Sequence, residues 1–207
     1  MPDFNKIYLY RMTHIDNVPH ILTHGITHVS SANTNKDFVP IGDNSLINSR
    51  NDFIIPNSRT LGDYIPFYFG VRMPMLYVIQ NGFNGVKATS VENIIYCVCS
   101  IASIIAQHVD FIFTDGHAVD LFSSFYNATE INNIETTIDS NAIARKYWID
   151  DKDLDIKRRK EAEFLAANDI PAAAIIGYVV YNERSKEKLN TLGIDNKNIV
   201  IKPNYYF

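Results

Sequence analysis

Segments of strand type and helix type alternate irregularly along this chain, and this order constrains its fold more than any other feature. The sequence predicts strands at residues 7–12, 111–113, 161–166, 175–181 and 199–202, and helices at residues 17–22, 91–108, 118–126 and 185–192. These segments do not form regular strand–helix–strand units, and no phosphate-binding glycine motif follows a strand. We therefore expect an α+β fold and not a Rossmann fold.

The length of 207 residues is enough for one domain with a sizeable core and short for two, so we expect a single domain over residues 1–207. Residues 27–60 are rich in Asn, Asp and Ser and are predicted to form a long loop, which inside a compact domain is usually functional. Residues 64–79 have strand-type aromatic sequence that two prolines interrupt. Because no run of 18 apolar residues and no signal peptide occur, we expect a cytoplasmic protein without a membrane segment.

The net charge of −4 argues against a protein that binds nucleic acid non-specifically over its whole surface. Residues 157–160, Lys-Arg-Arg-Lys, are the dense basic segment, and such a run is more often a solvated face than a phosphate clamp. Cys97 and Cys99 are expected to be buried thiols without a disulfide. No spacing of Cys or His predicts a metal site.

The candidate chemistry begins with Glu161 and Glu163, which on a strand would share one face. Paired carboxylates suit a site where positive charge develops on a sugar, although a solvent-facing pair is the commoner structure. The apolar residues 164–167 follow directly, which places Glu163 at the mouth of a buried strand.

Other polar residues are weaker candidates on their own. Thr13 and His14 end the first strand just before a helix starts, where free N–H groups can bind an anion or amide. Arg50 lies in the polar loop and is either a surface residue or a contact to a phosphate or base. The turn at residues 115–117 is more often structural than catalytic.

Several sequence blocks combine these residues in a fixed order. They are Tyr-Arg-Met-Thr-His-Ile-Asp-Asn at 10–17, Pro-Ile-Gly-Asp at 40–43, Gly-Asp-Tyr-Ile-Pro-Phe-Tyr-Phe at 62–69, Phe-Thr-Asp-Gly-His-Ala at 113–118 and Arg-Arg-Lys-Glu-Ala-Glu-Phe-Leu at 158–165. In this order the blocks resemble the DarT family, bacterial toxins that transfer ADP-ribose from NAD onto bases of single-stranded DNA. The central block, with Pro-Met-Leu-Tyr at 74–77, resembles the thymidine-modifying branch. The family usually has Gln where Glu161 stands.

The resemblance implies an ADP-ribosyltransferase-like fold with split central β-sheets flanked by helices and long loops. It implies that Glu163 stabilises the oxocarbenium character of the ribose as nicotinamide leaves. Arg50 would reach the NAD diphosphate and the acceptor base. Because a guanidinium stays protonated in proteins, we expect Arg50 to stabilise a thymine anion and not to act as a general base.

The remaining roles also follow from the resemblance. The further residues expected to bind NAD are Thr13, His14, Ile15, Leu22, Tyr68 and Met75. The residues expected to guide the DNA strand are Lys157, Arg158 and Arg159.

The leading hypothesis is therefore a toxin enzyme that acts on thymine in single-stranded DNA, with NAD as substrate and no metal. The expected partner is a macrodomain antitoxin, and the expected state is a monomer. The alternatives are the same transfer to RNA or protein, or a catalytically silent nucleic-acid-binding module. The intact Glu163, Arg50 and His14 and the acidic net charge disfavour the silent module.

Overall fold

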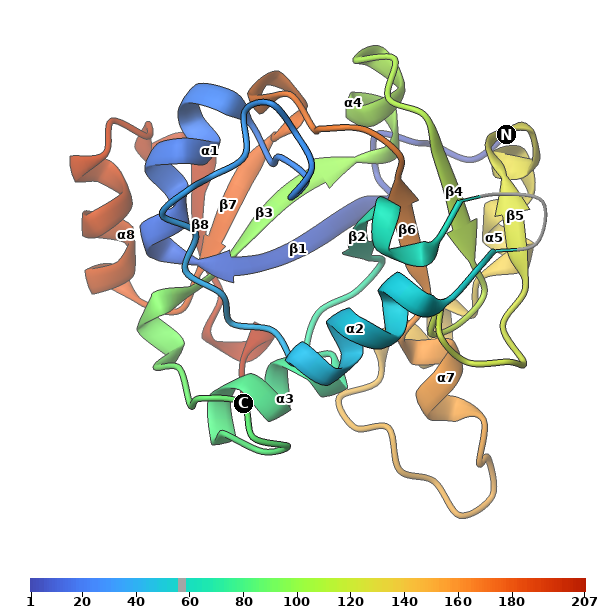
Figure 1. Ribbon diagram of the computed structural model, residues 1–207. Coiled ribbons are helices and arrows are strands. Elements are labelled where there is room, and N and C mark those ends of the chain that lie inside the picture. Colours follow the sequence, from blue (N-terminus) through green and yellow to red (C-terminus); the bar gives the residue numbers. More distant parts are fainter. Residues whose placement is uncertain (56–58) are drawn as a thin grey trace.

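One mixed sheet of eight strands forms the centre of the molecule (Figure 1). The computed structural model describes residues 1–55 and 59–207. The strands are β1 (Tyr8–His14), β2 (Ile65–Tyr68), β3 (Ile94–Ser100), β4 (Phe111–Thr114), β5 (Phe125–Asn127), β6 (Glu163–Ala166), β7 (Gly177–Val180) and β8 (Ile199–Ile201). Their order is β5-β4-β6-β2-β1-β3-β7-β8, with β7 and β8 parallel and the other pairs antiparallel.

The predicted α+β class is confirmed, and the predicted split of the sheet takes a weaker form. The strands make one hydrogen-bonded sheet and not separate sheets. Its two four-strand halves meet between β1 and β2, which pair through Tyr10 and Tyr68, whereas β1 and β3 pair along seven residues. Because the pairing is short, β1 and β2 diverge toward His14, the end of β1 that precedes α1 (Val18–His24).

Eight α-helices surround the sheet within the described residues. They are α1 (Val18–His24), α2 (Asn44–Asp52), α3 (Pro74–Asn81), α4 (Ile101–Ala106), α5 (Ile134–Thr137), α6 (Ser140–Ala144), α7 (Ile156–Lys160) and α8 (Glu183–Thr191). Figure 1 shows the segment between α1 and α2 running in front of β1, with α2 lying across the lower front of the sheet. None of the helices in residues 1–55 and 59–207 is long and apolar enough to cross a bilayer.

Strand β3 joins the two main cores, because all seven of its residues are buried. Ile95, Cys97 and Cys99 face the larger core, whereas Ile94 and Tyr96 face a second core that α3 and the C-terminal residues complete. Cys97 and Cys99 are free thiols, as expected. Burial raises the pKa of the Cys97 thiol to about 12, which leaves it protonated and unreactive.

The helix predicted at residues 91–108 is wrong over its first half. Residues 94–100 are strand β3, and the helix α4 begins only at Ile101. A strand that is buried on both faces loses its polar alternation and becomes a continuous apolar run, which also matches a helical period. Its Ile, Val and Tyr content favours the strand. Ser100 and Ser103 form the capping box that starts α4.

Three further elements differ from the sequence-based expectation. The loop predicted at 27–60 contains α2, which has no buried residue and therefore no apolar period. The strand material predicted at 64–79 ends at Tyr68, and Pro74 occupies the first turn of helix α3, where its missing N–H costs nothing. The helix predicted at 118–126 is a loop that leads into β5.

Candidate active site

Glu163 is the first residue of β6 and is completely buried. Its Oε2 accepts a hydrogen bond from Arg50 Nη1 at 2.8 Å, and its Oε1 accepts one from the backbone N–H of Ala118 at 2.9 Å. Its own backbone N–H donates to Thr114 Oγ1 at 3.0 Å. The contacts from Arg50 and Ala118 hold both oxygens of the carboxylate. A buried charge is stable in a protein only when it is paired and hydrogen-bonded in this way.

Arg50 reaches this carboxylate from the last turn of α2. Asp43 caps that helix, because its carboxylate accepts the Ser45 N–H at 2.8 Å. The second terminal nitrogen of Arg50, Nη2, is buried and has no hydrogen-bond partner among residues 1–55 and 59–207. A buried guanidinium N–H without a partner can donate to a bound ligand.

The turn at residues 115–117, interpreted from sequence as more often structural, approaches Glu163 directly. His117 Nε2 lies 4.0 Å from Glu163 Oε1, and burial lowers the pKa of this imidazole. His117 is therefore neutral at neutral pH and can offer either a donor or an acceptor. The Ala118 N–H contact could not be read from the sequence, since every residue other than proline carries that group.

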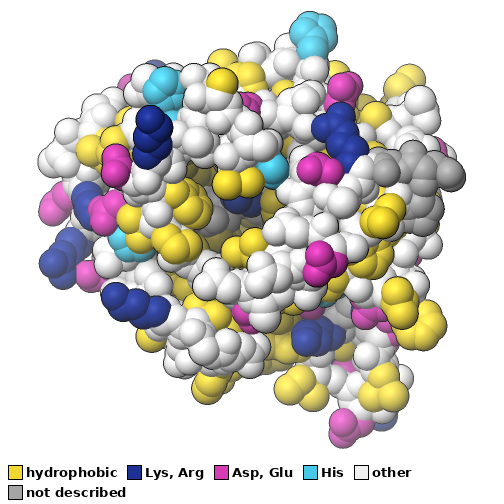
Figure 2. All heavy atoms as spheres, viewed as in Figure 1, with side chains coloured by type: hydrophobic (Ala, Val, Ile, Leu, Met, Phe, Trp, Pro, Cys, Tyr) yellow, Lys and Arg dark blue, Asp and Glu magenta, His cyan; other side chains and the backbone are white. Residues whose placement is uncertain are grey.

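A cavity of about 510 Å³ lies in front of the junction between β1 and β2. It is lined by β1, α1, the segment before α2, Arg50 and β2, with Arg11, Thr13, Asn17, Arg50 and Pro66 among the lining residues. In the view of Figure 1, Figure 2 shows a hollow near the centre of the face, with Lys or Arg atoms at its base and hydrophobic side chains around it. The volume suits a nucleotide-sized ligand.

Arg11 and Asn17 are cavity residues that the sequence interpretation missed. Arg11 Nη1 donates to the Pro66 carbonyl at 2.8 Å, and burial lowers the pKa of Arg11 to about 10. The Asn17 amide donates to Thr13 Oγ1 and to the Val39 carbonyl, both at 2.9 Å, and its oxygen accepts the Val39 N–H at 2.8 Å. Asn17 thereby fastens the long segment over the cavity. Neither the contact of Arg11 nor those of Asn17 can be recognised from a sequence motif or a periodicity.

The structure distributes the residues predicted to bind NAD over several environments. Thr13 and Arg50 line the cavity. Ile15 is fully buried in the core, Leu22 is exposed, and Met75 packs beside the second core. His14 caps the short helix after β1, since its Nδ1 accepts the Asp16 N–H at 3.2 Å.

Tyr68 of β2 lies opposite Glu163 in the strand register. Burial, together with the carboxylates of Glu163 and Glu161, raises the pKa of the Tyr68 phenol far above its usual value. Its hydroxyl is therefore protonated and can donate a hydrogen bond beside the Glu163 carboxylate.

The prediction that Glu161 and Glu163 share one strand face is wrong. Strand β6 begins at Glu163, and Glu161 is the C-cap residue of α7. Glu161 is nevertheless only 5 % exposed, and burial raises its pKa to about 8. The turn between α7 and β6 therefore carries a buried carboxylic acid next to the buried carboxylate.

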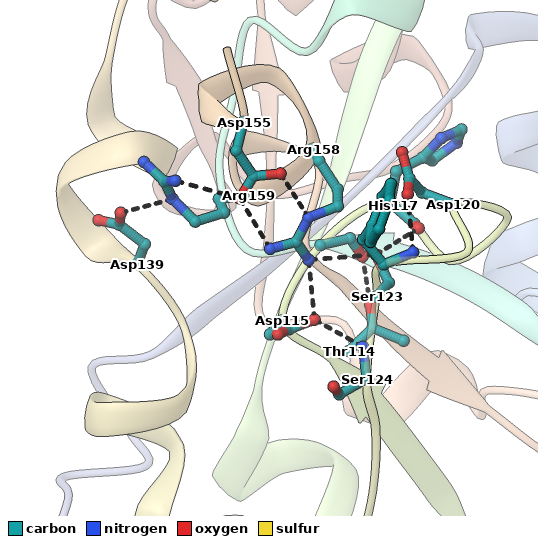
Figure 3. Close-up of polar contacts among 12 residues, drawn as sticks. Thr114, Asp115, His117, Asp120, Ser123, Ser124, Asp139, Asp155, Arg158 and Arg159 are labelled. Carbon is teal, nitrogen blue, oxygen red and sulfur yellow. Dashed lines mark hydrogen bonds and ion pairs between the residues drawn. The ribbon is translucent and has the colours of Figure 1, made fainter. Parts of the chain in front are cut away.

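The basic segment 157–160 forms most of α7, and three of its four cations are occupied within the molecule. Arg158 pairs with Asp155 at 2.7 Å and Asp115 at 3.0 Å, and Arg159 pairs with Asp139 at 3.0 Å (Figure 3). Lys160 is fully buried and donates to the Ile143 carbonyl at 3.0 Å. Lys157 is exposed.

No group of three or more His, Cys, Asp or Glu side chains that could hold a metal ion occurs in the described part of the chain.

Comparison with known proteins places this site in a family. A sequence profile described as "ssDNA thymidine ADP-ribosyltransferase, DarT" matches residues 10–207. The chain is 31 % identical over 186 residues to a DNA ADP-ribosyl transferase of Escherichia coli O127:H6, with 89 % of this chain and 84 % of the relative covered. It is 28 % identical over 200 residues to a DNA ADP-ribosyl transferase–DNA ADP-ribosyl glycohydrolase fusion protein of Thermosipho africanus, covering 96 % of this chain and 48 % of the fusion.

Solved structures of Thermus sp. 2.9 DarT have the same fold. The complex with ADP-ribosylated single-stranded DNA superposes with a TM-score of 0.84 at 27 % identity, covering 97 % of this chain and 96 % of that one. The complex with NAD⁺ superposes with a TM-score of 0.79 at 27 % identity, covering 100 % and 99 % of the two chains. With a profile match over nearly its whole length, the chain belongs to the DarT family of single-stranded DNA thymidine ADP-ribosyltransferases.

Proposed function

We propose that Glu163 and Arg50 carry out the reaction of this family in the present chain, the transfer of ADP-ribose from NAD to a thymine base in single-stranded DNA. The bond between the ribose C1′ and the nicotinamide nitrogen breaks, and nicotinamide leaves with the electron pair. A new bond forms between C1′ and the thymine ring nitrogen N3, whose proton is released. N3 is the thymine nitrogen that carries a proton in DNA, because N1 is bonded to deoxyribose.

The observation that carries this proposal is the completely buried Glu163 carboxylate, which is held on both oxygens and contacts the cavity-lining Arg50 at 2.8 Å. A fixed negative charge stabilises a ribose that becomes positive as nicotinamide leaves, and it needs no rearrangement at that moment. Removal from bulk water strengthens this interaction. The protonated hydroxyl of Tyr68, opposite Glu163 in the register, can orient a polar group of the ligand.

Arg50 supports the proposal through its unsatisfied nitrogen. One terminal nitrogen holds Glu163, and buried Nη2 has no partner among the described residues. A phosphate oxygen of NAD or a thymine oxygen would satisfy it, and the charge would stabilise the thymine anion that forms as N3 loses its proton. Arg11, which also lines the cavity, adds a second cation for the diphosphate.

We further propose that the chain is a toxin whose mark a macrodomain antitoxin removes. The Thermosipho africanus relative unites a transferase and a DNA ADP-ribosyl glycohydrolase in one fusion protein, and this chain matches 48 % of that length. A DNA ADP-ribosyl glycohydrolase of this kind would remove the mark that the present chain makes. We expect the transferase to act as a cytoplasmic monomer, which size-exclusion chromatography with light scattering would test.

A labelling experiment tests the central proposal. The purified protein is incubated with labelled NAD and short oligonucleotides of defined sequence, beside a Glu163→Gln variant that keeps the shape and removes the charge. Label on thymine-containing single-stranded DNA, absent with Glu163→Gln, is the expected result. Label on RNA or protein would overturn the substrate, and undiminished labelling by Glu163→Gln would overturn the mechanism.

Arg50→Ala separates the two roles of that residue. We expect it to abolish DNA modification more severely than it weakens NAD binding, as measured by calorimetric titration. If NAD affinity falls as much as DNA modification does, the role of Arg50 is to bind NAD only.

A further inference from the structure

The loop between β4 and β5, which binds the Glu163 carboxylate through Ala118, presents two large apolar side chains to solvent. Leu121 is 89 % exposed and Phe122 is 85 % exposed. The same loop contains Ala118, whose N–H binds Glu163 at 2.9 Å. A short, apolar loop tip is therefore attached directly to the proposed reaction centre.

Hydrogen bonds hold this loop in one shape (Figure 3). The Asp115 carboxylate accepts the Ser124 N–H at 2.8 Å, which closes the loop at its base. Ser123 Oγ donates to the His117 carbonyl at 2.8 Å, and the Phe122 N–H donates to the Asp120 carboxylate at 2.9 Å. The exposed side chains at the tip are consequently displayed by an ordered frame and not by a loose segment.

Helix α7 fastens the frame from outside. Arg158 Nη1 bonds Asp115 at 3.0 Å and Ser123 Oγ at 3.3 Å, and the Arg158 carbonyl accepts the His117 N–H at 2.9 Å. The arginine packs so closely on Gly116 that a Cβ there would lie 2.4 Å from its Nη1. Arg158 thus acts inside the protein, as the support of the loop.

These contacts leave little positive charge for a DNA strand on this side of the molecule. The net charge is −4, and the Arg158 and Arg159 guanidinium groups are paired with carboxylates. Exposed Lys157 is the cation of α7 that remains for a phosphate. A single strand held weakly by its phosphates needs stacking of its bases, since every base has a face that can pack on an aromatic ring.

We propose that Phe122, with Leu121 beside it, is the platform on which the base next to the target thymine stacks. The target base must unstack from the adjacent bases to enter the cavity. An apolar side chain can then stack on the adjacent base in place of the target base. This inference rests on the proposed DNA substrate. Exposed Lys157 directly precedes Arg158, whose side chain binds Asp115 of this loop, and we assign the adjoining phosphate to Lys157.

The test measures binding of a fluorescent thymine-containing oligonucleotide by anisotropy, and transfer from NAD over a range of oligonucleotide concentrations. We expect Phe122→Ala to raise Kd and the KM for DNA by about 5- to 150-fold, the range of base–aromatic stacking, with kcat and NAD affinity within about twofold. Phe122→Tyr keeps the ring and is expected to behave as the wild type. Val200→Ala, on the edge strand β8 at the far end of the sheet, is the control for loss of an exposed apolar side chain.

An abasic residue beside the thymine identifies the stacked base. It should weaken wild-type binding by the same factor as Phe122→Ala, and it should weaken the variant no further. Equal Kd values for wild type and Phe122→Ala would overturn the proposal, as would a variant that loses only its binding to a macrodomain partner. Failure of the DNA substrate itself would appear in the wild type, as an absence of transfer to any oligonucleotide.

Discussion

Glu163 and Arg50 form a buried ion pair whose members come from β6 and α2, so each depends on the other for charge compensation. The side chain of Arg50 is 15 % exposed and that of Glu163 is 0 % exposed. Removing one partner of a buried pair leaves an uncompensated charge, which commonly costs about 3–5 kcal/mol, whereas removing both is far less costly.

A double-mutant cycle measures this dependence. We expect Arg50→Met alone to lower the free energy of unfolding by about 3–5 kcal/mol, and Arg50→Met with Glu163→Gln to recover most of the loss. Urea denaturation of the four proteins gives the coupling. Strict additivity of the two single changes would show that the pair is not coupled in solution.

Glu161 gives the molecule a pH-dependent stability. Burial is the main cause of its raised pKa of about 8; Glu163 and Asp120 raise it further, and Lys157 and Lys160 oppose them. The Tyr68 phenol is a further titratable group near the Glu161 carboxyl. In the unfolded chain the pKa of Glu161 is near 4.5. Between pH 4.5 and pH 8 the folded state therefore binds more protons than the unfolded state. The contribution of Glu161 to stability is therefore full below pH 4.5 and declines as the pH rises toward 8.

Glu161→Gln keeps the shape of the side chain and removes its titration. We expect the variant to remove a slope of at most about 1.4 kcal/mol per pH unit from the unfolding free energy between pH 5 and 8. Transfer activity should fall above pH 8 in the wild type and persist in the variant. Urea midpoints and initial rates across pH 5–9 provide the measurement, and identical pH profiles for both proteins would refute this account.

The sequence analysis named Glu163 and Arg50 as separate candidates, but it predicted neither their contact with each other nor the groups that hold them. Glu163 belongs to the block at 158–165 and Arg50 lies in the polar loop after the block at 40–43, and the structure brings the two side chains to 2.8 Å. The Ala118 N–H and the Asn17 amide act through the backbone or across distant segments, where no periodicity or motif marks them. Glu161 was placed on the wrong element because strand β6 starts two residues later than its pattern indicates.

At the scale of elements, α7 differs most from its expected role. The sequence predicts a basic surface for DNA at Lys157, Arg158 and Arg159, and that prediction remains open. The structure engages the two arginines in ion pairs with Asp115, Asp139 and Asp155, which give α7 a function in supporting the loop that holds Glu163 (Figure 3).

Two substitutions on adjacent residues separate these functions. Lys157→Gln should weaken DNA binding uniformly across sequences and reduce the salt dependence of log K by about one unit, because one phosphate contact is lost. Arg158→Gln should lower kcat through disorder of residues 115–124 and leave the salt slope unchanged. Binding isotherms from 50 to 200 mM salt, with steady-state rates, distinguish the two. A reduced salt slope in Arg158→Gln would assign that arginine to DNA.

Two elements that the sequence failed to predict, α2 and β3, lack an amphipathic signal. Helix α2 buries none of its side chains and is stabilised by its Asp43 cap and by contacts with other segments. Strand β3 is buried on both faces. By contrast, α8 has one buried and one exposed side, and β1 alternates between buried and partly buried residues. Both were found close to their predicted positions.

At the scale of the whole molecule, one sheet and one principal core connect both ends of the chain. Phe4 and Ile7, near the N-terminus, and Ile201, near the C-terminus, pack against the same core cluster. The second core joins β3 to α3 and to the C-terminal aromatic residues, including Tyr206. We therefore propose a single domain over residues 1–207, since a division would have to cut the sheet.

A single cooperative unfolding transition is the corresponding prediction. Trp148, the one tryptophan of the chain, contacts Tyr77 and Phe207 and reports on the region around α3, whereas far-ultraviolet circular dichroism reports on the whole sheet. We expect both signals to share one urea midpoint. NAD at 100 times its Kd should raise the unfolding free energy from both signals by about 2.7 kcal/mol, because the ligand binds only the folded site. A fluorescence transition that precedes the circular dichroism transition, or that NAD does not shift, would mean that α3 and the C-terminal residues unfold separately from the cavity.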